Sequence, residues 1–224
     1  MIYVLAPHID DAILSIGGLI QGLVKKKKEV TVIYVFTISN WINPDAITRS
    51  NAIDDTVLVT KLRKTEEENV AKYLKYNYFF LDFEDFPIRK PFLNSLSEQL
   101  LIESIQSALK GFFNENDMCY FPIGIKHPDH QIVGTIGKNL RGAGYNIIFY
   151  EDIPYVADNE FDPEQFCARM KAEGFTHELI NIDINFKLSL LKKYKSQMSY
   201  EWLNCVRSYS INISGNGHNE RIWK

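Results

Sequence analysis

The chain has 224 residues, of which 46% are hydrophobic and 24% charged, and its formal net charge at pH 7 is −3. This composition is ordinary for a globular domain, and nothing in it suggests the basic surface that a nucleic-acid partner would need. No stretch approaches the roughly 20 apolar residues of a membrane-spanning helix, and three widely spaced cysteines favour free thiols in a reducing compartment. We therefore expect a cytoplasmic protein without a membrane span, built as a single domain over residues 1–224.

The first half of the chain alternates between strand-like and helix-like segments. Residues 2–6 predict a short buried strand, 11–24 carry apolar residues at helical spacing, and 29–36 are rich in β-branched and aromatic residues, as a buried strand is. The polar segment 37–56 is long for a connection, and such segments are often functional. The next segments are a helix over 61–75, a strand over 78–83, a loop with two prolines over 85–91 and a helix over 95–113.

The alternation continues in the second half. The segments are a strand over 118–121, a helix over 129–141, a strand over 146–150, an irregular stretch over 151–176 with a short helix at 163–172, a strand over 178–184, and helices over 185–197 and 200–207. The tail from residue 208 gives no clear pattern. Repeated strand–helix units predict an α/β fold, a mostly parallel sheet with helices on both faces.

Two short motifs each follow a strand-like segment: HIDD at residues 8–11 and HPDH at residues 127–130. In parallel sheets ligands bind at the carboxyl ends of strands, so both motifs are expected at one edge of the sheet. Together they offer three histidines and three carboxylates. A catalytic zinc site takes three ligands from His and Asp or Glu and keeps one position open for water. We therefore interpret the two motifs as one metal site.

Each motif taken alone has a simpler interpretation. A single histidine in a loop is usually a polar surface residue, and an Asp-Asp pair at a helix start is usually a cap. The occurrence of both motifs at strand ends favours the shared metal site. The Glu66-Glu67-Glu68 run, by contrast, is most simply a solvated helix face, and Arg63 on the same helix could pair there with Glu66 or Glu67.

The residues resemble a known family. The segment VLAPHIDDAILSIGG (4–18) is similar to the first metal-binding signature of the PIG-L-type, LmbE-like zinc-dependent N-deacetylases, and HPDH is similar to the second. Weaker matches follow at RKTE (63–66), YEDIPY (150–155), KKYKSQ (192–197) and NER (219–221). Ile9 and Ala12 stand where the family often has Pro and Glu. Neither position is a ligand, so the departure bears on the substrate rather than on the core chemistry.

The resemblance implies a Rossmann-like three-layer sandwich that holds one Zn²⁺, with Fe²⁺ as the alternative because His and Asp ligands suit several divalent ions. It implies hydrolysis of an acetamido group on a glucosamine-type sugar or its conjugate. Zinc would be held by His8, Asp11 and His130, and Asp10 would be the general base. His127 would stabilise the oxyanion or protonate the leaving amine, with Asp129 as its orienting partner. Arg63, and more weakly Tyr155, would hold substrate.

Other functions remain open at this stage. One is a zinc amidase that acts on another small-molecule amide. A second is a catalytically silent sugar-binding protein, which is disfavoured because Asp10 is present. A nucleotide-binding module lacks its GxGxxG signature here, and adjacent carboxylates at residues 10 and 11 would repel a phosphate. The sequence leaves open whether the chain forms a homo-oligomer.

Overall fold

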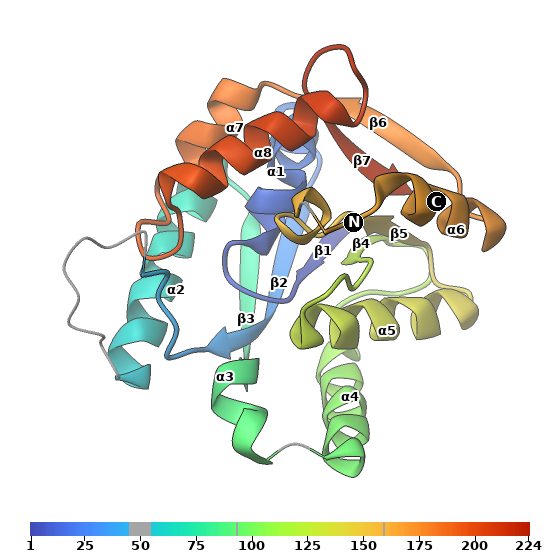
Figure 1. The fold of residues 1–224 in the computed structure, drawn as a ribbon. Coiled ribbons are helices and arrows are strands. Elements are labelled where there is room, and N and C mark those ends of the chain that lie inside the picture. Colours follow the sequence, from blue (N-terminus) through green and yellow to red (C-terminus); the bar gives the residue numbers. More distant parts are fainter. Residues whose placement is uncertain (45–54, 93, 159) are drawn as a thin grey trace.

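The computed structural model describes residues 1–44, 55–92, 94–158 and 160–224. Within these residues one sheet has the strand order β3-β2-β1-β4-β5-β7-β6 (Figure 1). The pairs from β3 through β5 are parallel, and β7 runs antiparallel to both β5 and β6. The strands are β1 (Ile2–Ala6), β2 (Val30–Ile38), β3 (Asn77–Glu84), β4 (Met118–Pro122), β5 (Ile147–Tyr150), β6 (His177–Asn181) and β7 (Asn219–Trp223).

Helices cover both faces of this sheet, as expected from the sequence. Side chains alternate between the faces along each strand: Val4 of β1 belongs to one core, whereas Tyr3 and Leu5 belong to the other. The first core packs against α1 (Asp11–Lys25), α2 (Thr56–Leu74), α7 (Ile184–Leu191) and α8 (Tyr200–Asn212). The second packs against α4 (Ser95–Leu109), α5 (Pro128–Gly142) and α6 (Pro163–Ala172). The predicted α/β class with a mostly parallel sheet is therefore confirmed.

The strand order reverses next to β1. The chain passes from β1 outward to β2 and β3, and then returns to place β4 on the other side of β1. The segments that follow β1 and β4 are therefore neighbours at the carboxyl edge of the sheet, where ligands bind in open α/β folds. Gly134 lets α5 lie close to the end of β4, because a Cβ there would lie 2.5 Å from the Ile123 carbonyl oxygen.

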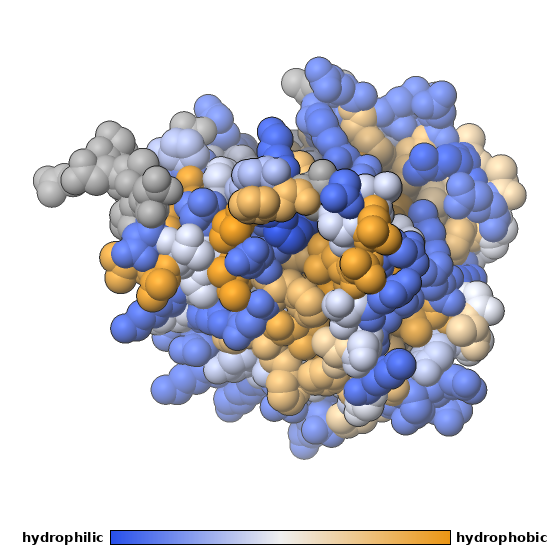
Figure 2. All heavy atoms as spheres, turned by 90° about the horizontal axis from the view of Figure 1, so that it is seen from below, coloured by the Kyte–Doolittle hydropathy of each residue, from blue (hydrophilic) through white to orange (hydrophobic). Residues whose placement is uncertain are grey.

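The segment after β3 differs from the expected loop. It forms the short helix α3 (Phe86–Arg89) and the 3₁₀ turn η1 (Lys90–Phe92). Pro87 is tolerated in the first turn of α3, where a missing N–H has no helical partner to lose. Figure 2 views the molecule from the side on which α3 lies, and shows hydrophobic residues among hydrophilic ones on this face. Among the residues that follow α3, Phe92 and Leu96 are exposed.

Several boundaries also differ. The helix expected over 95–113 ends at Leu109, because Gly111 takes a positive φ of 92°. The strand expected over 178–184 covers His177–Asn181, because Asp183 caps α7 by accepting from the Phe186 N–H at 3.0 Å. The expected helix over 185–197 ends at Leu191.

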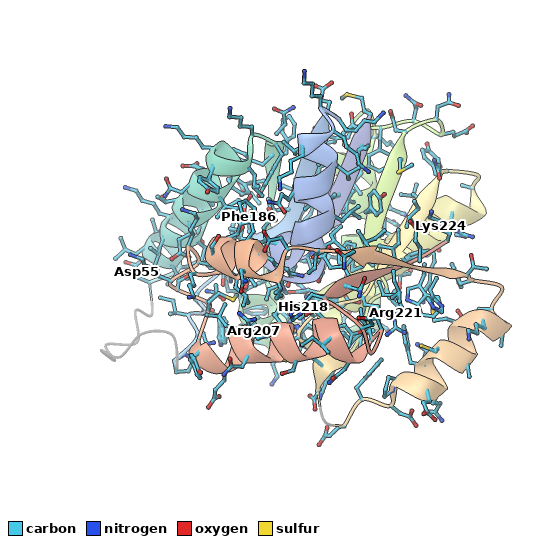
Figure 3. The ribbon with its side chains drawn as sticks, turned by 90° about the horizontal axis from the view of Figure 1, so that it is seen from above. Asp55, Phe186, Arg207, His218, Arg221 and Lys224 are labelled. Atoms are coloured by element: carbon cyan, nitrogen blue, oxygen red, sulfur yellow. The ribbon has the colours of Figure 1, made fainter. Side chains whose placement is uncertain are left out.

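The tail from residue 208, which gave no clear pattern, holds the end of α8 and the strand β7. Figure 3 shows this C-terminal segment, labelled at Arg221 and Lys224, beside β6. None of the helices in the described part of the chain combines the length and apolar character that crossing a bilayer requires. Of the segment expected to be irregular at 37–56, residues 45–54 lie outside the described part.

Candidate metal centre

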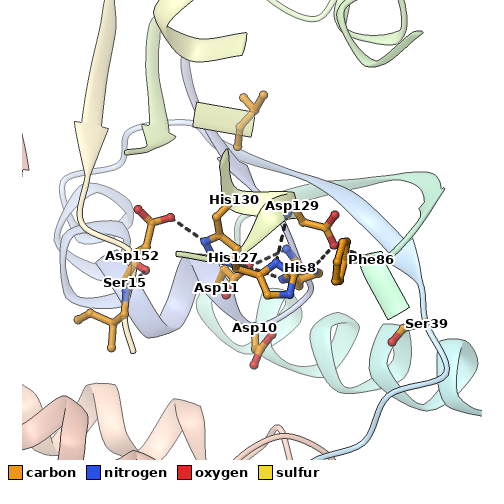
Figure 4. Close-up of polar contacts among 12 residues, drawn as sticks. His8, Asp10, Asp11, Ser15, Ser39, Phe86, His127, Asp129, His130 and Asp152 are labelled. Carbon is orange, nitrogen blue, oxygen red and sulfur yellow. Dashed lines mark hydrogen bonds and ion pairs between the residues drawn. The ribbon is translucent and has the colours of Figure 1, made fainter. Parts of the chain in front are cut away.

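The HIDD motif folds back on itself between β1 and α1. Asp11 is the first residue of α1, where a carboxylate is favoured by the helix dipole. Its Oδ2 accepts from the His8 N–H at 2.8 Å and lies 3.1 Å from His8 Nδ1 (Figure 4). The backbone of the turn thereby holds the imidazole and the carboxylate side by side.

The HPDH motif brings a second imidazole to the same carboxylate oxygen. His130, in the first turn of α5, is fully buried, and its Nε2 lies 3.0 Å from Asp11 Oδ2. This Nε2 has no hydrogen-bond partner among the described residues. His8 Nδ1, Asp11 Oδ2 and His130 Nε2 therefore converge. A further grouping includes the third imidazole, since ligand atoms of His8, His127 and His130 all lie within 4.8 Å of one another.

The remaining ring nitrogens of the two convergent histidines are held by carboxylates. His130 Nδ1 lies 2.6 Å from Asp152 Oδ1, and Asp152 Oδ2 accepts from the backbone N–H groups of Gly124 and Ile125. His8 Nε2 lies 2.9 Å from Asp129 Oδ2. Metal-binding histidines commonly donate their outer N–H to a carboxylate in this way. In the neutral rings, the inner nitrogens then direct lone pairs toward Asp11.

This donor set fits a divalent metal ion. Two lone pairs and a carboxylate oxygen repel one another at about 3 Å unless a cation or a proton lies among them. The negative charge of the surroundings is visible in the histidine pKa values. Burial alone would lower the pKa of His130, but Asp11 and Asp152 raise it to about 10. Asp11 and Asp129 likewise raise the pKa of His8 to about 9 against the effect of burial.

Asp129 does not make the expected contact with His127. Its buried carboxylate accepts from His8, from the Phe86 N–H at 2.9 Å and from Arg89. Burial alone would raise the pKa of Asp129, but the His8 hydrogen bond and the Arg89 charge lower it to about 2. The hydrogen bond that joins Asp129 to His127 comes from the Asp129 backbone, whose N–H donates to His127 Nδ1 at 3.2 Å.

That backbone contact sets the form of His127. A nitrogen that accepts from an N–H carries no proton, so His127 is a neutral ring with its proton on Nε2. Burial and the neighbouring histidines His8 and His130 also lower the pKa of His127 to about 4. Of the two roles expected for His127, a neutral ring with a proton on Nε2 favours stabilisation of the oxyanion over protonation of the leaving amine.

Asp10 lies beside the convergent groups and is 4% exposed. Arg63 Nη2 is 3.4 Å from Asp10 Oδ1, and Arg63 Nη1 donates to Ser39 Oγ at 2.9 Å. Arg63 thus points inward rather than along the helix surface. Burial and the Asp11 charge raise the pKa of Asp10, whereas Arg63 and His8 act in the opposite direction.

The expectation of a solvated glutamate run on α2 was wrong for two of its three residues. Glu66 accepts from the N–H and hydroxyl of Ser196, and Glu67 accepts from the hydroxyls of Tyr76 and Tyr194. Both glutamates are buried, and only Glu68 is exposed.

A cavity of about 300 Å³ opens onto these groups. Asp129 and His130 lie behind its wall, fully buried. Its lining consists of His8, Asp10, Asp11, Trp41, Arg63, Asp85, Pro87, His127, Pro154, Tyr155, Gln197 and Trp202. The Tyr155 ring contributes an aromatic wall, with its centroid 4.9 Å from that of His130 and 5.9 Å from that of His127. A larger hollow of about 710 Å³, lined by Met1, Tyr3 and Phe79 among others, contains none of the predicted site residues.

Three residues of this region were given no role from the sequence. Asp152 lies two residues after β5 and within the YEDIPY match, so both its place near a strand end and that match were available signals. Asp85 follows β3, is 2% exposed and leaves its Oδ1 without a hydrogen-bond partner among the described residues. It precedes α3 but does not cap it with its side chain. Trp202 lines the cavity from α8, and nothing in its local sequence indicated this position.

The chain is similar to several known proteins. A family model described as "PIG-L: GlcNAc-PI de-N-acetylase" matches residues 3–140. A 2'-N-acetylparomamine deacetylase from Niallia circulans is 25% identical over 189 residues, which cover 70% of this chain and 68% of that protein. The zinc-inhibited form of teicoplanin deacetylase Orf2 shares the fold with a TM-score of 0.74 at 19% identity, over 99% of this chain and 96% of its own. For the N,N'-diacetylchitobiose deacetylase from Pyrococcus horikoshii the TM-score is 0.65 at 15% identity, over 99% and 82% of the two chains.

Proposed function

Since the chain belongs to the PIG-L family of de-N-acetylases, which hydrolyse amide bonds, we propose that it removes the acetyl group from an N-acetylated amino sugar of the N-acetylglucosamine type or from its conjugate. The products are acetate and a free amine. One observation carries the proposal: His8 Nδ1, Asp11 Oδ2 and His130 Nε2 converge beside the buried carboxylate of Asp10. The names of the similar proteins, which are deacetylases of amino-sugar compounds, support it.

The proposed cofactor is Zn²⁺ held by His8, Asp11 and His130, with Fe²⁺ as the alternative. Two imidazoles and one carboxylate are a ligand set that catalytic zinc sites use, and Asp129 and Asp152 supply the outer hydrogen bonds. When bound, the ion lowers the pKa of a water molecule and polarises the amide carbonyl.

Asp10 moves the proton in this proposal. Its carboxylate lines the cavity together with His8 and Asp11. In the sequence, Asp10 lies between these two proposed ligands, in the same turn. Burial and the Asp11 charge raise its pKa, which makes it a better base, and the Arg63 charge opposes this rise. Asp10 accepts a proton from the attacking water. It then gives that proton to the amide nitrogen as the carbon–nitrogen bond breaks, so that the amine leaves neutral.

His127 stabilises the negative charge that develops on the amide oxygen. Because its Nδ1 is engaged by the Asp129 N–H, its Nε2–H is the group left to donate. A donor fixed before the reaction costs no reorganisation when the charge develops. This role needs no protonation of the ring, and His127 Nδ1 keeps its hydrogen bond to the Asp129 backbone N–H throughout the reaction.

Arg63, Tyr155 and Asp85 are the proposed contacts to the sugar. The cavity, at about 300 Å³, lies at the small end of ligand pockets, which suits one sugar ring with its acetamido group. Tyr155 offers an aromatic wall, and the Arg63 Nε has no hydrogen-bond partner among the described residues. The unpaired Asp85 Oδ1 is costly to bury, and a sugar hydroxyl that donates to it would remove this cost.

Replacing Asp85 by alanine is expected to lower kcat/KM for the sugar substrate by roughly 10- to 100-fold, which is the worth of a hydrogen bond to a charged group. The zinc content should not change, because in the described structure no hydrogen bond or ion pair joins the Asp85 side chain to a proposed ligand. Steady-state kinetics would measure this, with the exposed neighbour Glu84→Ala as the matched control. Unchanged kcat/KM in Asp85→Ala would remove Asp85 from the sugar contacts.

Release of amine from a panel of amides tests the proposed function. Zinc-loaded protein would be incubated with N-acetylglucosamine, N,N'-diacetylchitobiose, an N-acetylated aminoglycoside and several N-acetylated amino acids. Amine release from one or more of the sugars supports the proposal. Release from the amino acids alone would favour the amidase alternative. Binding of a sugar in calorimetry without release from any compound would favour the silent binding protein.

A further inference from the structure

Arg89, at the end of α3, has no part in the chemistry above, yet its side chain is only 11% exposed and is held on three sides. Its Nη1 donates to the Glu84 carbonyl oxygen and its Nη2 to Asp129 Oδ1. The guanidinium lies over the Phe36 ring, 4.5 Å from the ring centroid. A planar group fixed in this way presents one N–H in a defined direction.

The Asp129 carboxylate is fully occupied by this arrangement. Oδ1 accepts from Arg89, and Oδ2 faces both His8 Nε2 and the Phe86 N–H, each at 2.9 Å. An ionised carboxylate can only accept hydrogen bonds, so His8 Nε2 must carry the ring proton. In the neutral ring, the lone pair of His8 is therefore on Nδ1, the nitrogen that faces Asp11.

The two outer carboxylates of the centre are held differently. Asp152, behind His130, is fixed by the backbone N–H groups of Gly124 and Ile125, which are present whatever side chain other than proline stands there. Asp129, behind His8, has one backbone donor, Phe86, and depends on the Arg89 side chain for the other oxygen. Without Arg89, Oδ1 would be a buried anionic oxygen without a donor, and the carboxylate would be free to turn.

Arg89 also supports His8 through Phe36. The Phe36 ring lies against both the guanidinium and the His8 ring, and the centroids of the Phe36 and His8 rings are 6.3 Å apart. The Phe36 N–H donates to the Pro7 carbonyl at 2.8 Å, immediately before His8. The same guanidinium thus contacts two of the groups that surround the imidazole, Asp129 and Phe36.

We propose that Arg89 is a positioning residue of the metal centre. It holds Asp129 so that His8 keeps its proton on Nε2 and presents Nδ1 to the metal ion. This inference rests on the proposed function only in that His8 is taken as a metal ligand. The residue that orients His8 therefore lies in α3, distant in the sequence from both HIDD and HPDH and outside any recognisable motif.

The test is the zinc affinity of the metal-free protein, measured by competition with a chromophoric chelator, for wild type, Arg89→Ala and Arg89→Lys. Loss of an outer partner of a metal ligand typically weakens binding about 10- to 100-fold, and we expect this range for Arg89→Ala. Arg89→Lys keeps the charge, but a single ammonium group cannot replace both the hydrogen bond to Glu84 and the one to Asp129. Its zinc affinity should therefore lie between those of wild type and Arg89→Ala. The exposed neighbour Lys90→Ala should match wild type.

The visible spectrum of the cobalt-loaded proteins gives a second readout, which a general loss of stability would not move. A changed absorption band in folded Arg89→Ala supports a changed ligand geometry at His8. Zinc affinity and cobalt spectrum equal to wild type in Arg89→Ala would overturn the inference. If that variant does not fold, Arg89→Lys decides in the same way. Wild type that binds no zinc would instead contradict the proposed function, so the two failures are distinguishable.

Discussion

Replacing Asp10 by alanine is expected to leave the zinc content unchanged and to lower kcat by at least about 10²-fold, the lower end of the range for general acid–base groups. The proposed metal ligands are His8, Asp11 and His130, so removal of the Asp10 carboxylate leaves all three in place. What is lost is the group that accepts the proton of the attacking water and returns it to the amine. The rate of amine release and the metal content of the same preparation would measure this.

Asn is the sharper replacement at this position, because it keeps the size of the side chain but cannot take up a proton. Asp10→Asn should lose as much activity as Asp10→Ala. Glu68→Gln, which changes an exposed carboxylate on α2, is the control and should keep full activity. Turnover near the wild-type rate in a zinc-loaded Asp10→Ala protein would exclude Asp10 as the base.

Replacing His127 by alanine is expected to lower kcat by about 10²- to 10³-fold, the usual effect of removing one donor to an oxyanion. The Michaelis constant should change much less, because the hydrogen bond strengthens only as charge develops on the amide oxygen. His127→Gln retains an N–H donor and should recover part of the loss. Steady-state kinetics on zinc-loaded protein separates kcat from KM.

The metal content of His127→Ala distinguishes between the two ways of grouping the histidines. If His127 is a donor to the substrate, as proposed, the variant binds zinc as tightly as wild type. If the ion instead sits among His8, His127 and His130, whose ligand atoms lie within 4.8 Å of one another, the variant loses zinc together with activity. Loss of zinc would contradict the role of His127 in the proposed mechanism.

The sequence predicted the parts of the fold and site that depend on local pattern. Apolar runs gave the strands β1, β2, β4 and β5, and the HIDD and HPDH motifs at the ends of β1 and β4 followed from them. Parallel strands bring their carboxyl ends to one edge, so the convergence on Asp11 was predictable without coordinates. The position of β7 in the sheet could not be predicted from the sequence. Its five residues are all buried, but Glu220 and Arg221 are paired with Lys187 and Glu151, partners far away in the chain.

The role expected of Asp129 shows a different limit. Its nearness to His127 in sequence suggested a side-chain pair. Residues two apart at a helix start do not face each other, and the Asp129 carboxylate turns instead toward His8 and Arg89. Asp85 and Arg89 were not predicted as site residues. The groups near them follow β1 and β4, which are distant from α3 in the sequence, so no local pattern indicated their roles.

The metal content of the purified protein tests most directly whether the two motifs share one ion. It would be measured by plasma mass spectrometry on protein purified without a histidine tag, for wild type and for His130→Ala. We expect about one zinc or iron per wild-type chain and loss of that metal in His130→Ala. A wild-type protein that holds no metal, even after incubation with zinc, would contradict the shared site and with it the proposed hydrolase.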